Sequence, residues 1–220
     1  MATIETDSTQ EATVYDRLVE LVFSGGYEPG SKLTERGLAR QLQVSRIPVR
    51  EALGRMVAQG LLLGGGRREG VRIRRYMPDE IRQLYEFRQF LEVGIVRSAT
   101  KYARGEDLEQ LESIWREMDR HVGEYGSDIW AKLDHAFHEA LARAGHNKRA
   151  IRMLGLLLTE CHFVFYLRPA RHRGQPTSDE ATEWMKKVQQ EHRLLIKHVL
   201  AGEAEAAEKV VCKHLVFDRF

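Results

Sequence analysis

Residues 34–75 constrain the fold of this chain more than any other segment, because two short helical patterns are followed there by a hairpin pattern. A favoured N-cap residue precedes a helix over residues 35–41, and Ser45 is a favoured N-cap for a second helix. Apolar and polar residues then alternate around a glycine-rich turn in residues 61–74. This order of elements predicts a winged helix-turn-helix, in which the second helix enters a DNA groove.

Basic side chains are concentrated in nearly the same segment. Residues 31–75 contain eleven lysines and arginines against three acids, a net charge of +8, so the rest of the chain carries −6 of the total of +2. A basic module attached to a mildly acidic remainder is typical of a protein in which one part contacts a polyanion. A solvated basic face is the alternative that charge alone leaves open.

From Pro78 onward only helical periodicity is found, with breaks near Gly105, residues 123–126, residues 145–146, residues 168–176 and Gly202. We therefore predict a mainly α protein. Its N-terminal winged helix-turn-helix has three helices plus a two-stranded wing, and its C-terminal part is an all-α antiparallel bundle of six or seven helices.

The expected organisation is a disordered arm over residues 1–10, the winged domain over residues 11–75 and the helical domain over residues 78–220. No stretch approaches the roughly 20 apolar residues that cross a bilayer, and the N-terminus lacks the pattern of a signal peptide. We expect a cytoplasmic protein without a membrane partner. Cys161 and Cys212 form no metal-binding spacing and are expected to be buried thiols.

Arg46 and Arg50 lie four residues apart on the second helix of the motif and so share one face. That face is opposite to the apolar stripe of Val49, Leu53 and Val57. The spacing predicts that both guanidinium groups project together into a groove of DNA.

The residues PGSKLTERGLARQLQVSRIPVREALGRMVAQGLL (29–62) and REGVRI (68–73) resemble the winged helix of the GntR family of bacterial regulators. The resemblance implies binding to double-stranded operator DNA and assigns the contacts to Arg36, Ser45, Arg46, Arg50 and the wing glycine Gly70. Arginine can bind a guanine edge or a phosphate through two hydrogen bonds.

Four polar residues of the helical part occupy positions on apolar faces. Asp134 and His138 are one helical turn apart, and His192 and His214 each interrupt an apolar stripe of a later helix. One aspartate and three histidines suit zinc, nickel, manganese or iron. Spacing alone does not show that His192 and His214 converge on the first pair, and buried histidines are often ordinary core residues.

The segments LYEFRQFLE (84–92), LDHAFHEAL (133–141) and QEHRLLIKHVLAGEAEAAEKVVCKHL (190–215) are similar to the metal-containing FCD-type effector domain of the FadR subfamily within the GntR family. The resemblance implies that Asp134, His138, His192 and His214 hold a divalent metal ion, with zinc as the first expectation. It also implies that residues 78–220 bind the effector and form the dimer.

Arg88 lies on the apolar stripe of the first helix of this part, so its guanidinium needs a buried partner. One interpretation is a clamp for a carboxylate of the effector, and the other is a structural ion pair with a neighbouring acid.

Together these features predict a homodimeric, ligand-responsive transcriptional regulator, by default a repressor, that binds a pseudo-palindromic operator. A metal ion helps it to bind a small carboxylate metabolite. One alternative is a metal-dependent hydrolase-like enzyme, because metal-bound water is a nucleophile. The other is a regulator whose signal is the metal itself.

Overall fold

A computed structural model of the chain describes residues 14–22, 27–64, 70–124, 128–167 and 178–215. The chain divides into two compact units, Met1–Met77 with Phe163–Arg168 and Pro78–His162 with Pro169–Phe220. Each unit contains a hydrophobic core of its own. The arm expected over residues 1–10 lies outside the described residues.

The first unit contains the helix-turn-helix that the sequence predicts. Residues 14–22 are helical, α2 spans Glu35–Leu42 and α3 spans Arg46–Ala58. The hydroxyl of Thr34 caps α2 by accepting a hydrogen bond from the backbone N–H of Gly37 over 3.2 Å. The apolar stripe of α3 faces the core, as its periodicity predicts.

The predicted two-stranded wing is present, and a third strand extends it into an antiparallel sheet. Its strands are β1 (Lys32–Leu33), β2 (Leu62–Gly64) and β3 (Val71–Ile73), in the order β1-β3-β2. Leu33 pairs with Val71, so the residues just before α2 form the additional edge strand. A strand of two residues is too short for alternation to be recognised. The basic tip of the wing lies in residues 65–69, outside the described residues.

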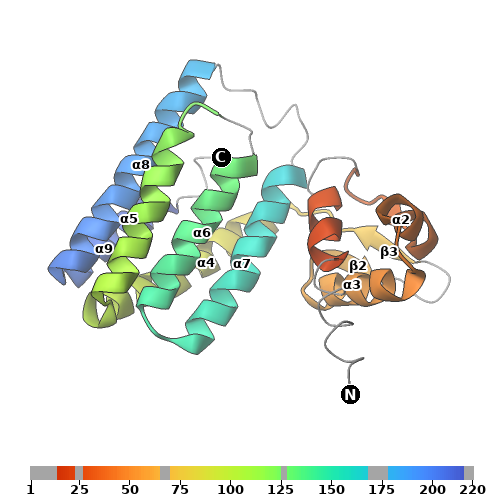
Figure 1. Cartoon of the computed structure of the whole chain (residues 1–220), viewed down its shortest axis with the longest axis horizontal. Helices are drawn as coiled ribbons and strands as arrows, with labels where there is room; N and C mark the ends of the chain where they lie inside the picture. The colour runs from red at the N-terminus through yellow and green to blue at the C-terminus, as the bar shows by residue number, and fades with distance from the viewer. Residues whose placement is uncertain (1–13, 23–26, 65–69, 125–127, 168–177, 216–220) are drawn as a thin grey trace. The chain divides into compact units, whose positions relative to one another are not determined.

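The second unit contains six helices among its described residues, within the predicted range of six or seven. Their bounds are α4 Pro78–Tyr102, α5 Gly105–Arg120, α6 Asp128–Ala144, α7 Lys148–Leu167, α8 Ser178–Ala201 and α9 Ala204–His214, and the end of α7 from Phe163 belongs to the first unit. The helices begin and end at the breaks that the sequence shows. Figure 1 shows α5 between α6 and α8, and contacts connect α5 with both.

Helix α4 organises this bundle because it contacts α6, α8 and α9. Its buried residues, among them Ile95 and Val96, pack in one core with Phe137 of α6, Leu195 of α8 and Val211 of α9. Apolar side chains are therefore buried where these four helices meet. A polar side chain buried there needs a hydrogen-bond partner within the protein.

Two further expectations can be compared with the described residues. Cys161 is buried, but Cys212 is exposed, so the expectation of two buried thiols is wrong for the second one. Burial raises the pKa of the Cys161 thiol to about 11. None of the helices in the described ranges has the length and apolar character needed to span a bilayer.

Candidate metal centre and nucleic-acid interface

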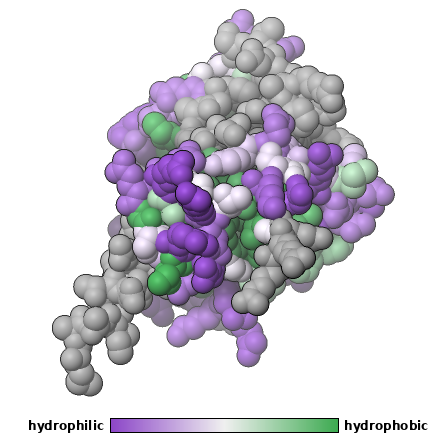
Figure 2. Space-filling view, turned by 90° about the vertical axis from the view of Figure 1, so that its right-hand side faces the viewer, coloured by the Kyte–Doolittle hydropathy of each residue, from purple (hydrophilic) through white to green (hydrophobic). Residues whose placement is uncertain are grey.

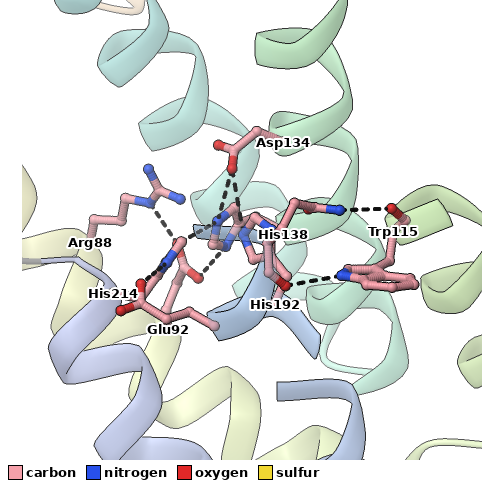
Figure 3. A network of polar contacts seen from close by, with 9 residues as sticks. Arg88, Glu92, Trp115, Asp134, His138, His192 and His214 are labelled. Carbon is pink, nitrogen blue, oxygen red and sulfur yellow. Dashed lines mark hydrogen bonds and ion pairs between the residues drawn. The ribbon is translucent and has the colours of Figure 1, made fainter. Parts of the chain in front are cut away.

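Four side chains from three helices converge in the core of the helical unit (Figure 3). Asp134 and His138 come from α6, His192 from α8 and His214 from α9, and one possible ligand atom of each lies within 4.8 Å of the others. The Nε2 atoms of His138 and His214 are 3.2 Å apart. Asp134 Oδ1 lies 3.5 Å from His192 Nε2. The structure thus brings His192 and His214 to Asp134 and His138, a convergence that spacing alone does not show.

The three imidazoles are buried and lie close to one another. Burial lowers the pKa of His192 well below its ordinary value, and the nearby His214 and His138 lower it further. Burial likewise lowers the pKa of His214. Neutral imidazole is the form of histidine that binds metal ions.

His192 provides the observation that tests whether a cation fits. Both of its ring nitrogens are buried and neither has a hydrogen-bond partner. Buried polar groups in proteins are almost always paired, so two unpaired nitrogens on one ring require an explanation. Three imidazole nitrogens and the Asp134 carboxylate are a donor set that suits a divalent transition metal ion. The residues present therefore fit the implied ion.

Two buried glutamates that the sequence reasoning missed contact the outer nitrogens of two of these rings. His138 Nδ1 donates to Glu92 Oε2 over 2.7 Å, and His214 Nδ1 donates to Glu191 Oε2 over 3.1 Å. Burial by itself raises the pKa of Glu92, but its hydrogen-bonded partners His138 and Arg88 outweigh burial and hold that pKa well below its ordinary value. The local signal for Glu92 is its spacing of four residues from Arg88, which is common on exposed helices and so does not single it out.

The guanidinium of Arg88 is buried beside this cluster. Its Nε donates to Glu92 Oε1 over 2.6 Å, so the ion pair with a neighbouring acid is present. Its Nη2, however, is buried without a hydrogen-bond partner. An unused donor therefore remains on Arg88 after the ion pair is formed.

On the first unit, Arg46 and Arg50 project from the exposed face of α3, with exposed side-chain fractions of 61% and 62%. Both bind Glu35, the first residue of α2. Arg50 Nε and Nη2 lie 2.8 and 2.9 Å from its two oxygens, and Arg46 Nη2 lies 3.1 Å from Oε2. The hydrogen bond from Arg50 is the main reason that the pKa of Glu35 is lowered to about 2.

The other residues assigned to DNA contact also lie on the first unit. Arg36 and Ser45 are exposed. Ser45 occupies the N-cap position of α3, but its side chain forms no capping hydrogen bond, so the cap expected from the sequence is absent. Gly70 has a φ of +71°, and a Cβ atom there would lie 3.0 Å from Lys32 Cε. In Figure 2 the coloured residues of the face shown are largely hydrophilic, with smaller hydrophobic areas among them.

Comparisons with known proteins agree with this arrangement. The family model for "Bacterial regulatory proteins, gntR family" matches residues 10–73, and the FCD domain model matches residues 83–217. The HTH-type transcriptional regulator YdhC of Bacillus subtilis is 29% identical, covering 93% of this chain and 87% of YdhC. LutR of the same organism, also an HTH-type transcriptional regulator, is 28% identical, covering 89% and 93%.

A solved structure, Escherichia coli McbR/YncC, superimposes with a TM-score of 0.74 at 18% identity and covers 93% of this chain and 92% of that one. At this identity the likeness concerns the fold alone. The matching relatives are regulators of transcription.

Proposed function

The chain belongs to the GntR family of bacterial regulatory proteins and carries an FCD domain, and from this premise we propose that it is a homodimeric repressor whose binding to operator DNA responds to a small carboxylate effector. A divalent cation helps to bind that effector. The family matches and relatives are transcriptional regulators and not enzymes, so the hydrolase alternative is set aside. The observation that carries the proposal is the cluster in the FCD domain of three buried histidines, His138, His192 and His214, with the partly buried Asp134.

Zinc is the first expectation for the cation, and nickel, manganese and iron suit the same donors. The test is elemental analysis of protein purified without chelators, beside the variant His192→Ala with His214→Ala. About one transition metal ion per chain in the wild type, absent from the double variant, is the expected result. Metal-free wild-type protein would overturn the metal site and leave the DNA-binding function intact.

Arg88 is the residue that we propose for the effector carboxylate. The unpaired Nη2 supports this role, because a buried guanidinium nitrogen without a partner is stabilised by an incoming carboxylate. A cation held by the cluster would attract the same carboxylate. An effector that binds two arrangements of the dimer differently by about 1 to 3 kcal/mol would change operator affinity about 5- to 150-fold.

The DNA contacts proposed are Arg46 and Arg50 on α3, with Arg36, Ser45 and the wing residue Gly70. Two arginines exposed on one face of the second helix support entry of α3 into the major groove. A two-fold dimer reads two half-sites, so the operator should be a pseudo-palindrome. Repression then follows from occlusion of the promoter.

An exposed apolar surface on α4 and α7 supports the proposed dimer. Phe90 is 72% exposed, and Phe87, Met153 and Leu156 are also exposed. Phe90 borders a groove that extends to Gly94 on α4 and Ala150 on α7, and the space above Gly94 is open. In a two-fold contact each surface meets its own copy, so a phenyl ring one turn from an open glycine can fill the gap on the other protomer.

The dimer is tested by sedimentation of the variant Phe90→Glu, with Leu200→Glu as the control because Leu200 is 68% exposed on α8. Wild type and control should sediment as dimers and Phe90→Glu as a monomer. A dimeric Phe90→Glu protein would place the interface elsewhere.

The remaining alternative is that the metal itself is the signal. A buried site with mixed nitrogen and oxygen donors favours a resident ion that orients the effector. Measuring operator affinity while the cation is titrated into metal-free protein distinguishes the metal signal from the carboxylate signal. A switch caused by the cation alone would replace the carboxylate proposal.

A further inference from the structure

The three histidines of the cluster are held in two different ways. His138 and His214 each use Nδ1 to donate to a buried carboxylate, and their Nε2 atoms face each other at 3.2 Å. A carboxylate can only accept, so the proton of each neutral ring is placed on Nδ1 and the lone pair is left on Nε2. That lone pair is the one directed into the cluster.

We propose that Glu92 and Glu191 are positioning residues that fix His138 and His214 for a cation, and that Glu92 also connects the cation to Arg88. The proposal rests on the metal site of the proposed function. It extends the site from four ligands to a set of buried partners that orient those ligands, as carboxylates behind metal-binding histidines commonly do.

The two glutamates differ in what else they bind. Glu92 gives Oε2 to His138 and Oε1 to Arg88, over 2.7 and 2.6 Å, and is fully buried. Glu191 gives Oε2 to His214, and its Oε1 lies 4.0 Å from Lys213 Nζ. Glu92 therefore lies between a metal ligand and the arginine proposed for the effector. A change at Arg88 reaches His138 through one shared carboxylate.

No carboxylate is hydrogen-bonded to His192, although Asp134 Oδ1 lies 3.5 Å from its Nε2. Its ring lies against that of Phe137, with centroids 4.2 Å apart and planes inclined by 34°, and its nitrogens have no hydrogen-bond partner. Ring packing leaves the choice of the protonated nitrogen open. His192 thus provides an internal comparison in which no hydrogen-bonded carboxylate selects the tautomer.

The test compares three variants, Glu92→Gln, Glu191→Leu and Glu191→Gln. A glutamine at position 92 has one acceptor for two donors, so the charged guanidinium takes the oxygen and the amide turns its N–H groups toward His138. That ring must then move its proton to Nε2. Leucine at position 191 removes the acceptor of His214, whereas glutamine there keeps an acceptor for that ring and removes only the charge.

Nitrogen-15 NMR of the histidine rings in the metal-free protein reads the tautomers directly. We expect protonated Nδ1 for His138 and His214 in the wild type. Glu92→Gln should change His138 and leave His214 unaltered, Glu191→Leu should do the reverse, and Glu191→Gln should change neither. The Nε–H signal of Arg88 should shift in Glu92→Gln alone.

Zinc affinity, measured by competition with a chromophoric chelator, is the second readout. Glu92→Gln and Glu191→Leu should each bind zinc about 10- to 100-fold more weakly than the wild type. The control Glu86→Gln, on the exposed side of α4 where Glu86 pairs with Arg82, should bind zinc as the wild type does.

Unchanged tautomers and zinc affinities in both Glu92→Gln and Glu191→Leu would overturn the positioning role while leaving the metal site in place. Wild-type protein that binds no zinc, nickel, manganese or iron would remove the proposed metal site, and the tautomers of the metal-free protein would still decide the role of the glutamates. If Glu92→Gln does not fold, Glu191→Leu decides it through His214.

Discussion

At the scale of single residues, Arg46 and Arg50 share one carboxylate, that of Glu35, on the surface of the first unit. If these arginines contact the operator as proposed, DNA phosphates and guanine edges compete with Glu35 for the same guanidinium nitrogens, and binding exchanges one set of hydrogen bonds for another. The net gain in binding free energy would therefore be smaller than for arginines that have no carboxylate partner in the unbound protein.

Replacing Arg46 or Arg50 by alanine should weaken operator binding by about 1 to 3 kcal/mol, because a bidentate contact to a base is lost. Fluorescence anisotropy with a labelled operator at fixed salt measures the change. Arg116→Ala is the control, since Arg116 is an exposed arginine of α5 paired with Glu112. Equal losses in all three variants would mean that general charge, and not these two contacts, determines affinity.

Glu35 predicts a pH dependence. Its pKa is lowered to about 2 in the folded protein, mainly by the hydrogen bond from Arg50, so its contribution to folding stability is fully present above its ordinary pKa of 4.5. That contribution is lost as the pH falls from about 4.5 to about 2. Urea unfolding measures the free energy of unfolding of the wild type and of Glu35→Gln. The difference between these two free energies should become smaller as the pH falls over that interval.

Because the ion pairs of Glu35 are exposed, salt should also reduce the difference in free energy of unfolding between the wild type and Glu35→Gln. A stability difference between wild type and Glu35→Gln that does not change between pH 5 and pH 2 would contradict the role of the carboxylate.

The residues of the candidate metal site could be predicted to different degrees. Asp134, His138, His192 and His214 stand out because each interrupts an apolar face. Glu92 does not stand out by residue type, because an acid four residues from an arginine is usual on exposed helices. Its partner His138 lies 46 residues away, and no local pattern encodes such a contact.

At the scale of elements, periodicity and helix-breaking residues predict where the helices lie, because apolar stripes and glycine breaks act over a few residues. The strand β1 could not be predicted, since it exists only because Lys32 and Leu33 pair with β3 about forty residues later. Helix caps are intermediate in how well the sequence predicts them. The N-cap residue can be read from the sequence, but the hydrogen bond depends on the geometry of the turn.

Thr34 and Ser45 provide a matched test of this distinction. Thr34→Ala removes the hydrogen bond to the N–H of Gly37 and should lower the free energy of unfolding by about 1 kcal/mol. Ser45→Ala removes no capping hydrogen bond and should leave stability unchanged while it weakens operator binding. Urea titration and operator anisotropy measure the two effects. A comparable loss of stability in Ser45→Ala would mean that its hydroxyl does cap α3 in solution.

At the scale of the whole molecule, the proposed cation binds the folded protein and stabilises it by mass action. With free zinc at 100 times the dissociation constant, the gain is about 2.7 kcal/mol. Chelation should therefore lower the melting temperature of the wild type in calorimetry, and zinc should restore it. The variant His192→Ala with His214→Ala should melt at one temperature in both conditions. An equal response of wild type and double variant to the chelator would contradict specific binding.

The position of His214 has a consequence for the end of the chain. It is the last residue of α9, a helix of 11 residues, which is short for a helix that must persist on its own. Through the cation this residue would be tied to His138, which precedes it by 76 positions. The ion would then act as a removable cross-link that fastens the C-terminal segment to the bundle. Cleavage by a protease after residue 201 should accordingly report, in a cell extract, how much of the protein carries its metal.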